Sequence, residues 1–390
     1  MTKIGIEITP MLVEFQTGIE QYVSALVQEL AGYENRIDDI RLVYYLHTGN
    51  PFSSKSQVRK VLSLLDDSDA DYRVYSNKRG YGLALSYYTR REKLDLIHMP
   101  RCDRPRRGVC PYIVTFHDIN QVALEHEERA IERSNFTSCH KSTLDAASGI
   151  IFVSESTKKD LIEKHGYQMT APYKIIHHGV GRHFFSNNQL NSSVIKIKIP
   201  TPYILFVGSI QFRKNLARLV EAFGMLKETR RIPHKLVLVG RNSWGAELVF
   251  EKINELSLQH DVIFTGYVAD HDLPQIYAMA DVFAYTSLHE GFGIPILEAF
   301  ASETVVITSQ VYSMPEVAGD AAIYVDPRDA GSIATGLWRA ISDQELRKQL
   351  RERGVQRARQ FTWQKSAQST IDFYKEVVDN INQDSGNRQF

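Results

Sequence analysis

Short runs of apolar residues, each followed by glycine or polar residues, recur along the whole chain. In the first half they cover residues 3–8, 41–46, 94–98, 112–116 and 149–153. In the second half they cover residues 203–207, 235–239, 262–264, 282–285, 305–308 and 322–325. Runs of this length with few charges are typical of strands that are buried on both faces, as in a parallel sheet.

The segments between these runs have the periodicity of amphipathic helices. In the first of them, the apolar residues fall on one helical face: Ile19, Tyr22, Val23, Leu26, Val27 and Leu30. Strands that alternate with helices indicate β-α-β units, so the pattern predicts α/β domains with doubly wound parallel sheets.

A polar, asparagine-rich segment with two nearby prolines separates the two series of strands, and we predict the domain linker there. We therefore expect an N-terminal domain over 1–185, a linker over 186–202, a C-terminal domain over 203–362, a last helix over 363–382 and a loose tail over 383–390.

Composition narrows the class of protein. The 390 residues allow two or three domains, and the 46 Lys and Arg balance the 46 Asp and Glu, so no overall charge points to nucleic acid. Three cysteines match no zinc spacing and cannot all pair, which indicates a reducing compartment. The N-terminus does not resemble a signal peptide and no apolar run approaches a membrane span, so we expect a cytoplasmic protein.

One segment departs from this balance. Residues 55–107 contain 13 Lys and Arg but seven Asp and Glu, a net charge of about +6. Two interpretations stay open. The segment is either a solvated face, or it attracts an anionic membrane at the inner side of the cell or a lipid acceptor linked through a diphosphate.

The motif His-Glu-Gly-Phe-Gly-Ile-Pro-Ile-Leu-Glu follows the apolar run at 282–285. Gly291 and Gly293 let the backbone approach a ligand, and Pro295 suits the first turn of a helix. The free amides and the dipole of a helix start favour an anion. Glu290 and Glu298 add carboxylates that accept hydrogen bonds from hydroxyl groups. The motif therefore predicts a site for a phosphate that lies between two hydroxyl-rich groups.

A second motif, Gly-Ser-Ile-Gln-Phe-Arg-Lys-Asn-Leu, follows the run at 203–207. Arg213 and Lys214 stand at a helix start, where the dipole by itself favours acidic residues. A bound anion would offset the repulsion between the helix dipole and two adjacent cations at this position. Together the two cations can hold a diphosphate.

Polar residues also follow the strands of the first half. His98, His117 with Asp118, and Ser154 with Ser156 each come at the end of an apolar run. Ligands of open α/β sheets bind beyond these strand ends, so the histidines are candidate site residues. Ser154 and Ser156 can equally be N-caps of the helix that follows.

Two glutamates separated by seven residues, with Gly-Phe-Gly-Ile-Pro between them, resemble the signature of retaining glycosyltransferases of the family 4 type, which have the GT-B fold. The likeness covers almost the whole chain and is strongest over 203–329. It implies two Rossmann-like domains that face a central cleft, an N-terminal acceptor domain and a C-terminal sugar-nucleotide domain. It also implies that the last helix crosses back to the N-terminal domain.

The resemblance assigns roles to the motif residues. Arg213 and Lys214 bind the diphosphate, and His117 lies near the transferred sugar. Glu290 contacts the donor hexose and Glu298 the ribose, so His117, Arg213, Lys214 and Glu290 are the expected catalytic residues. The other expected donor-binding residues are Gly18, Ser209, Tyr267, Val268, Gly291, Phe292, Gly293 and Ile294. Gly18 stands where the family has a double glycine, and Asn215 stands where some members have glycine.

The implied activity is retaining transfer of a hexose from a nucleoside-diphosphate sugar to a glycan or lipid-linked acceptor in surface polysaccharide synthesis. GDP-mannose is the first expected donor and UDP-hexoses come next. No metal or other cofactor is expected, because the two cations replace one. Asp270-His271-Asp272 nominally matches a metal-binding motif, but we interpret Asp272 as a helix N-cap with Pro274 in the first turn.

Three alternatives stay open at this point. The first is a non-catalytic homologue that binds a sugar nucleotide or a glycan, against which the intact Arg213, Lys214, Glu290 and Glu298 argue. The second and third are a phosphorylase and a nucleotide-sugar epimerase of the same fold.

Overall fold

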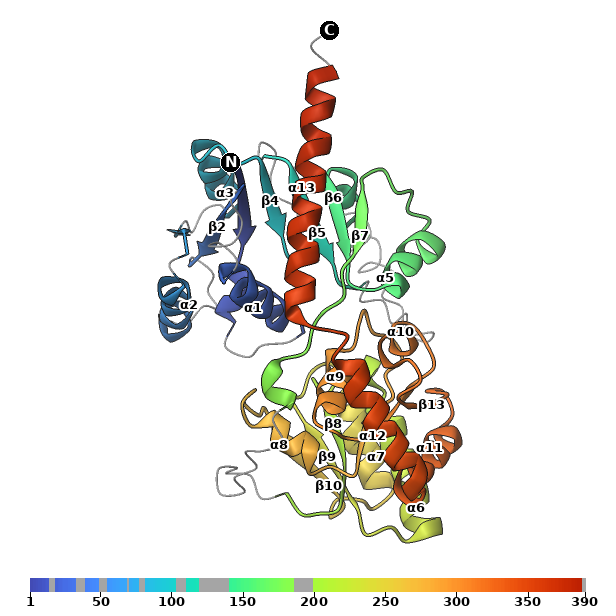
Figure 1. Ribbon diagram of the computed structural model, residues 1–390. Helices are drawn as coiled ribbons and strands as arrows, with labels where there is room; N and C mark the ends of the chain where they lie inside the picture. The colour runs from blue at the N-terminus through green and yellow to red at the C-terminus, as the bar shows by residue number, and fades with distance from the viewer. Residues whose placement is uncertain are drawn as a thin grey trace. The chain divides into compact units, whose positions relative to one another are not determined.

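The computed structural model describes residues 1–13, 18–32, 39–48, 55–68, 70–76, 81–102, 110–118, 140–185 and 199–387. The chain divides into two compact units (Figure 1). The first unit comprises Met1–His178 and Trp363–Phe390, and the second comprises Gly179–Thr362.

The first unit ends earlier than the predicted domain boundary at residue 185. Val180 forms a parallel bridge with Thr362, and the Phe184 ring packs 5.9 Å from the Tyr277 ring. These contacts assign residues 179–185 to the second unit, because their partners belong to it. Most of the predicted linker, residues 186–198, lies outside the described residues.

The first unit contains a seven-stranded parallel sheet in the order β3-β2-β1-β4-β5-β6-β7. Its strands are β1 Thr2–Glu7, β2 Ile40–His47, β3 Tyr72–Tyr75, β4 Leu96–Met99, β5 Tyr112–Phe116, β6 Gly149–Phe152 and β7 Tyr173–Ile175. The five strands predicted here are confirmed. β3 and β7 were not predicted, because they lie at the two edges of the sheet, where exposed and charged residues replace an apolar run.

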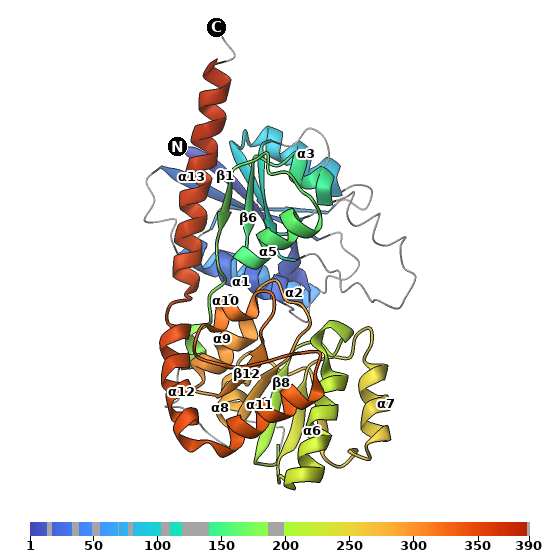
Figure 2. The ribbon, with the colours of Figure 1, turned by 90° about the vertical axis from the view of Figure 1, so that its right-hand side faces the viewer.

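Helices cover both faces of this sheet. They are α1 Gly18–Ala31, α2 Lys55–Asp67, α3 Tyr81–Arg91, α5 Glu155–Lys159 and α13 Trp363–Asn387. Figure 2 shows α13 on one face of the sheet and α3 and α5 on the opposite face. The helix that was expected after Ser154 and Ser156 is observed as α5 followed by a π-helical turn at Asp160–Lys164.

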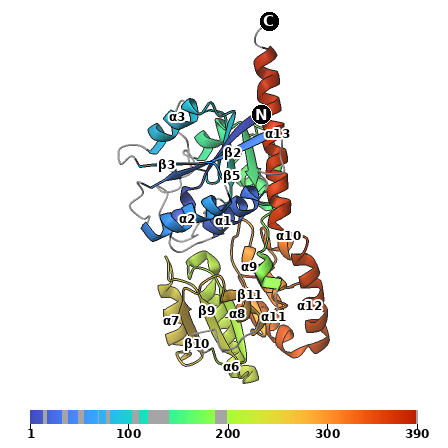
Figure 3. The same cartoon turned by 60° about the vertical axis from the view of Figure 1, so that its left-hand side comes forward.

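The last helix, α13, packs along the sheet of the first unit, beside α1 (Figure 3). A Cβ atom added at Gly149 of β6 would lie 2.9 Å from Val377 Cγ2, so glycine permits this close approach. Tyr374 Oη lies 2.6 Å from Nδ1 of His98, which is fully buried. The helix extends to Asn387, beyond the predicted end at 382, and its added residues Gln383 and Asp384 are exposed and polar.

Part of the basic segment is neutralised within this unit. Arg73 pairs with Asp71 and, through Nε at 2.9 Å, with Glu92. Lys55, Arg59 and Lys60 are exposed on α2, while residues 69, 77–80 and 103–107 of the segment lie outside the described residues. Binding to an anionic membrane stays a prediction. In the parts of the chain that the structure describes, no helix is long and apolar enough to cross a membrane.

The second unit contains a six-stranded parallel sheet in the order β10-β9-β8-β11-β12-β13. Its strands are β8 Tyr203–Val207, β9 Lys235–Val239, β10 Val262–Gly266, β11 Val282–Tyr285, β12 Val306–Ser309 and β13 Ile323–Val325. All six begin and end within two residues of the predicted runs. The predicted class, doubly wound α/β with parallel sheets, is therefore confirmed for both units.

The helices of this sheet are α6 Leu216–Arg230, α7 Glu247–Glu255, α8 Leu273–Ala278, α9 Ile294–Ala301, α10 Met314–Ala318, α11 Ala330–Ser342 and α12 Gln344–Ala358. Figure 2 shows α6 and α7 on one face of the sheet and α8, α9 and α12 on the other. The winding reverses between the neighbouring strands β8 and β11. Both sequence motifs follow these two strands, so the fold brings them together at the switch point.

The contact between His98 and α13 leads to a first prediction. Tyr374→Phe removes the hydroxyl partner of a fully buried imidazole nitrogen and should lower the free energy of unfolding by about 1–3 kcal/mol. Urea unfolding measures this loss. Tyr87→Phe is the matched control, because its hydroxyl lies in an exposed contact with Arg91, and this change should cost little. Equal stability of both variants would contradict an anchoring role for Tyr374.

Candidate active site

The loop after β8 is held against the end of β11 by Asn215. Asn215 has the left-handed conformation, with φ of 61° and ψ of 31°, at the junction between a 3-10 turn (Phe212–Lys214) and α6. Its Nδ2 donates to the carbonyl oxygens of Thr286, at 3.0 Å, and Pro327, at 2.6 Å. Asparagine and glycine both tolerate this conformation, which explains why asparagine is acceptable where the resembling family has glycine.

Arg213 and Lys214 meet Glu290 across the gap between the two motifs. Arg213 Nη1 lies 2.5 Å from Glu290 Oε2, and Lys214 Nζ lies 2.6 Å from Glu290 Oε1. The exposed fractions of the three side chains are 19% for Arg213, 7% for Lys214 and 6% for Glu290. Lys214 Nζ also donates to Tyr285 Oη at 2.7 Å, and Arg213 Nη1 donates to the His289 carbonyl at 3.1 Å.

The charges of this cluster stabilise one another. Burial acts to raise the pKa of Glu290, but the charges of Arg213 and Lys214 outweigh it and lower that pKa to about 2. Glu290 is therefore ionised at any physiological pH. With one anion and two cations, the cluster keeps a net charge of +1, so it can attract an anionic ligand.

The loop of the signature motif is braced before α9 begins. Ser313 Oγ lies 2.8 Å from the carbonyl oxygens of both Glu290 and Phe292, which share its single hydroxyl proton. Gly293 is the N-cap of α9 with φ of 111°, a conformation that favours glycine. Pro295 stands in the first turn, as predicted. The start of α9 therefore follows directly after the loop whose Glu290 pairs with both cations.

Glu298 lies further along α9 and is 3% exposed. Tyr277 of α8 donates a hydrogen bond from Oη to Glu298 Oε2 at 2.8 Å. Burial, together with the neighbouring Glu298 carboxylate, raises the pKa of Tyr277 well above its usual value, so the phenol stays protonated and keeps donating. Sequence reasoning missed Tyr277 and Tyr285, since no local pattern distinguishes them from other apolar core residues.

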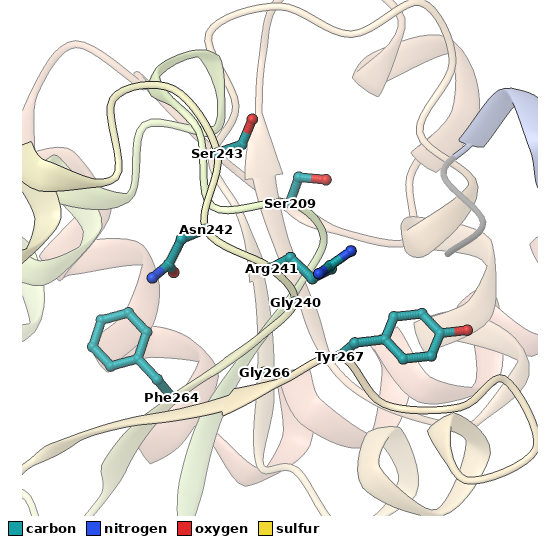
Figure 4. Close-up of a pocket in the computed structure, with 8 residues that line it drawn as sticks. All are labelled: Ser209, Gly240, Arg241, Asn242, Ser243, Phe264, Gly266 and Tyr267. Atoms are coloured by element: carbon teal, nitrogen blue, oxygen red, sulfur yellow. The ribbon is translucent and has the colours of Figure 1, made fainter. Parts of the chain in front are cut away.

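A pocket of about 560 Å³ opens at the ends of β8, β9 and β10 (Figure 4). Its lining includes Ser209 and Tyr267, which were predicted as donor-binding residues. The other lining residues are Gly240, Arg241, Asn242, Ser243, Phe264 and Gly266, of which Arg241, Asn242, Ser243 and Phe264 were not predicted. In Figure 4 the Asn242 amide points toward the Phe264 ring, whereas the Arg241 guanidinium extends toward Tyr267. Gly240, which follows the apolar run at 235–239, was the feature of the sequence that could have indicated this loop.

The remaining predicted donor-binding residues of this unit are mostly buried. Val268, Phe292 and Ile294 are 4–6% exposed, so only their backbone groups or small parts of their side chains can reach a ligand. Val268 does not line the pocket of Figure 4.

The first unit carries the predicted His117 at the end of β5. His117 Nε2 lies 2.8 Å from the Pro100 carbonyl oxygen, which can only accept a hydrogen bond, so Nε2 carries the proton. Burial lowers the pKa of His117, which favours the neutral ring with Nδ1 as an acceptor. Tyr22 packs edge-on against this ring at 5.0 Å. Gly18 is the exposed first residue of α1, one turn before Tyr22.

The other polar residues at the strand ends of this unit have structural partners. His98 Nε2 lies 2.7 Å from Thr115 Oγ1, which in turn lies 3.1 Å from Tyr22 Oη. His98 is thus a buried link between α13 and α1 and does not face a ligand. Ser154 is the N-cap of α5 and accepts a hydrogen bond from the Thr157 amide at 3.0 Å.

The side chains of Asp270 and Asp272, from the nominal metal-binding motif, lie in two different structural settings. Asp272 occupies the N-cap position of α8 with Pro274 in the first turn, although its side chain makes no capping hydrogen bond. Asp270 pairs with His183 Nε2 at 3.1 Å. Within the described ranges, no three His, Cys, Asp or Glu side chains are grouped so that they could hold a metal ion.

Two family models match the chain and together account for both units. Residues 17–182 match "Glycosyltransferase Family 4", and residues 188–357 match "Glycosyl transferases group 1". The chain is a glycosyltransferase of the GT-B fold. The second of these matches contains both motifs that meet at the buried cation cluster of the glycosyltransferase.

Curated relatives of this glycosyltransferase include two from Escherichia coli. The O-antigen chain mannosyltransferase B is 28% identical in an alignment 385 positions long that covers 92% of this chain and 96% of the relative. The serotype-specific mannosyltransferase WbdA is 25% identical in an alignment 378 positions long that again covers 92% of this chain but only 45% of WbdA.

Solved structures share the fold at low identity. Sucrose-phosphate synthase from Thermosynechococcus elongatus superposes with a TM-score of 0.75 at 19% identity, over 97% of this chain and 100% of that structure. Anabaena HepE, solved in complex with UDP-glucose, gives a TM-score of 0.72 at 17% identity, over 96% of this chain and 100% of that structure. These likenesses support the GT-B fold alone.

The role of Asn215 leads to a second prediction. Asn215→Ala removes both side-chain hydrogen bonds and places alanine in the left-handed region, so unfolding free energy should fall by about 2–4 kcal/mol. Asn215→Gly loses the hydrogen bonds but relieves the backbone strain, so it should be the more stable of the two variants. Chemical denaturation followed by circular dichroism compares them. An alanine variant as stable as the wild type would show that Asn215 does not hold this loop.

Proposed function

We propose that this glycosyltransferase moves a hexose from a nucleoside-diphosphate sugar to a glycan or lipid-linked saccharide acceptor in surface polysaccharide synthesis. The observation that carries this proposal is the buried cluster of Arg213, Lys214 and Glu290 beside the start of α9. A net positive, water-poor site with helix amides suits a diphosphate, and the neighbouring pocket is large enough for a nucleoside.

The chemistry follows from where charge develops. As the bond from the anomeric carbon to the diphosphate oxygen breaks, negative charge gathers on the β-phosphate and the sugar gains positive charge. Arg213, Lys214 and the amides of the 291–293 loop are fixed donors that stabilise the leaving group without reorganising. The acceptor hydroxyl attacks from the face that the diphosphate leaves and gives its proton to the departing phosphate, so the configuration at the anomeric carbon is retained.

The other site residues position the donor. Glu298, held by Tyr277, accepts hydrogen bonds from the ribose hydroxyls. Glu290 accepts hydrogen bonds from hydroxyl groups of the hexose. In the first unit, Nδ1 of the neutral His117 ring can accept a hydrogen bond from a saccharide hydroxyl. No metal is needed in this mechanism, because the two buried cations supply the charge that a divalent ion would otherwise supply.

Mannose from GDP-mannose is the first donor that we propose. Two relatives that align with 92% of this chain are named mannosyltransferases. Arg241 adds a physical reason, since a guanidinium can donate two parallel hydrogen bonds to O6 and N7 of guanine. Uracil lacks this pair of acceptors. UDP-hexose is the second candidate, favoured by the similar fold of a protein that was solved with UDP-glucose.

The proposed donor site leads to a third prediction. Titration calorimetry with GDP, UDP and ADP should give the tightest binding for GDP. Arg213→Ala and Lys214→Ala should each raise the donor KM by roughly 10- to 100-fold, because each removes a charge-assisted contact of about 1.5–3 kcal/mol. Lys252→Ala, which removes a cation from the ion pair with Glu255 on the surface of α7, is the control and should leave binding unchanged. Unchanged nucleotide affinity in both site variants would refute the diphosphate assignment.

A fourth prediction concerns metal ions. Hexose transfer should continue in excess EDTA at the rate seen without it, since the charge on the leaving group is met by Arg213 and Lys214. The measurement is the release of nucleoside diphosphate with and without chelator. Full loss of transfer in EDTA, restored by Mn²⁺, would overturn the metal-independent mechanism and return attention to Asp270 and Asp272.

A further inference from the structure

Glu290 forms ion pairs with both of the cations that we propose as the binding site of the donor diphosphate. Its two carboxylate oxygens each take one cation, with Oε2 on Arg213 and Oε1 on Lys214. The family resemblance implied only that Glu290 contacts the donor hexose. The ion pairs add a second feature, because the carboxylate lies where an anionic ligand of these cations would lie.

We propose that Glu290 is an internal counter-ion that the donor diphosphate displaces. In the state described here the carboxylate neutralises one of the two buried charges. When the diphosphate arrives, it takes over Arg213 and Lys214, and the released carboxylate turns to the hydroxyl groups of the hexose. This inference rests on the proposed function, since it concerns the same donor site.

The burial of the cluster explains why a counter-ion is needed before the donor binds. Lys214 is 7% exposed and also donates to the neutral Tyr285 hydroxyl, whereas Arg213 is half-buried at 19%. A buried cation that loses its paired anion destabilises the folded protein strongly. Glu290 therefore helps the buried Lys214 and the half-buried Arg213 to stay charged in the ligand-free protein.

The displacement requires the side chain to move but not the loop. Ser313 holds the backbone carbonyls on both sides of Gly291, and Gly293 fixes the start of α9. The Glu290 side chain has three rotatable bonds beyond this braced backbone. A rotamer change can thus move the carboxylate away from Arg213 and Lys214 while the amides of the loop keep their place.

The counter-ion also has a consequence for turnover. The nucleoside diphosphate that remains after transfer carries more negative charge than the diphosphate of the donor, so two uncompensated cations would hold it tightly. A carboxylate that returns to Arg213 and Lys214 competes with this product and speeds its release. Glu290 should therefore weaken the affinity for free nucleoside diphosphate while it supports catalysis.

The test is calorimetry of GDP, UDP and inorganic pyrophosphate with the full-length wild type, Glu290→Gln and Glu255→Gln. The glutamine variant should bind the nucleotide that the wild type prefers, and pyrophosphate, about 10-fold or more tightly, because the competing charge is gone. Its kcat should fall and product inhibition should strengthen. Glu255→Gln breaks an exposed ion pair in the same unit and should bind as the wild type does.

Thermal unfolding distinguishes a counter-ion that the diphosphate displaces from an ion pair that only stabilises the fold. Without ligand, the Glu290→Gln variant should have a lower Tm than the wild type. Saturating ligand should raise the Tm of the variant by more than it raises the Tm of the wild type. If the variant is unfolded when isolated, recovery of the fold in millimolar pyrophosphate supports the inference, and failure to recover contradicts it.

Two negative results have different meanings. A folded Glu290→Gln with equal or weaker affinity for nucleoside diphosphate and pyrophosphate would overturn the counter-ion inference and leave the proposed function standing. A wild type that binds none of the nucleotides and no pyrophosphate would instead refute the proposed donor site.

Discussion

A buried cation, Lys214, lies beside a half-buried one, Arg213, and both need an anionic group against them; this constraint shapes the second unit. Arg213 and Lys214 come from the loop after β8, whereas Glu290 comes from the loop after β11. The neighbouring strands must therefore end at the same level, and both loops must be fixed. Asn215 and Ser313 supply that fixation through hydrogen bonds to carbonyl groups. The reversal of winding between β8 and β11 places the cluster where parallel sheets bind ligands.

The cluster of Arg213, Lys214 and Glu290 affects both the stability of the fold and the proposed reaction. A charge that is shielded from water interacts strongly with any anion that replaces its partner. In the proposed reaction these cations stabilise a leaving diphosphate, and we infer that the free energy of their pairing with Glu290 sets how tightly they hold it. In the first unit, by contrast, the buried polar chain Tyr374–His98–Thr115–Tyr22 is uncharged. It links α13 and α1 through β4 and through β5, the strand that leads to His117.

Much of this architecture could be predicted from the sequence, because strands buried on both faces must be apolar and because glycine and proline mark the turns around the motifs. The edge strands β3 and β7 could not be predicted in the same way, since exposed edges carry polar residues. The meeting of the two motifs was predictable from parallel topology. The pairing of Glu290 with both cations was not, because spacing along the chain does not reveal the direction of a side chain.

Residues that act through distant contacts were also missed. Tyr277 reaches Glu298 from another helix, and Arg241 enters the pocket from a loop that has no conspicuous motif. Asn215 was noticed only as a departure from glycine, although its conformation and its two carbonyl partners are what hold the loop.

A crystal structure with GDP bound tests the central claim most directly. The β-phosphate should lie within hydrogen-bonding distance of Arg213, Lys214 and the amides of the 291–293 loop, with guanine in the pocket beside Arg241 and Tyr267. The Glu290 carboxylate should have left at least one of the two cations. A nucleotide that binds elsewhere, or a diphosphate that leaves Glu290 paired with both cations, would contradict the account.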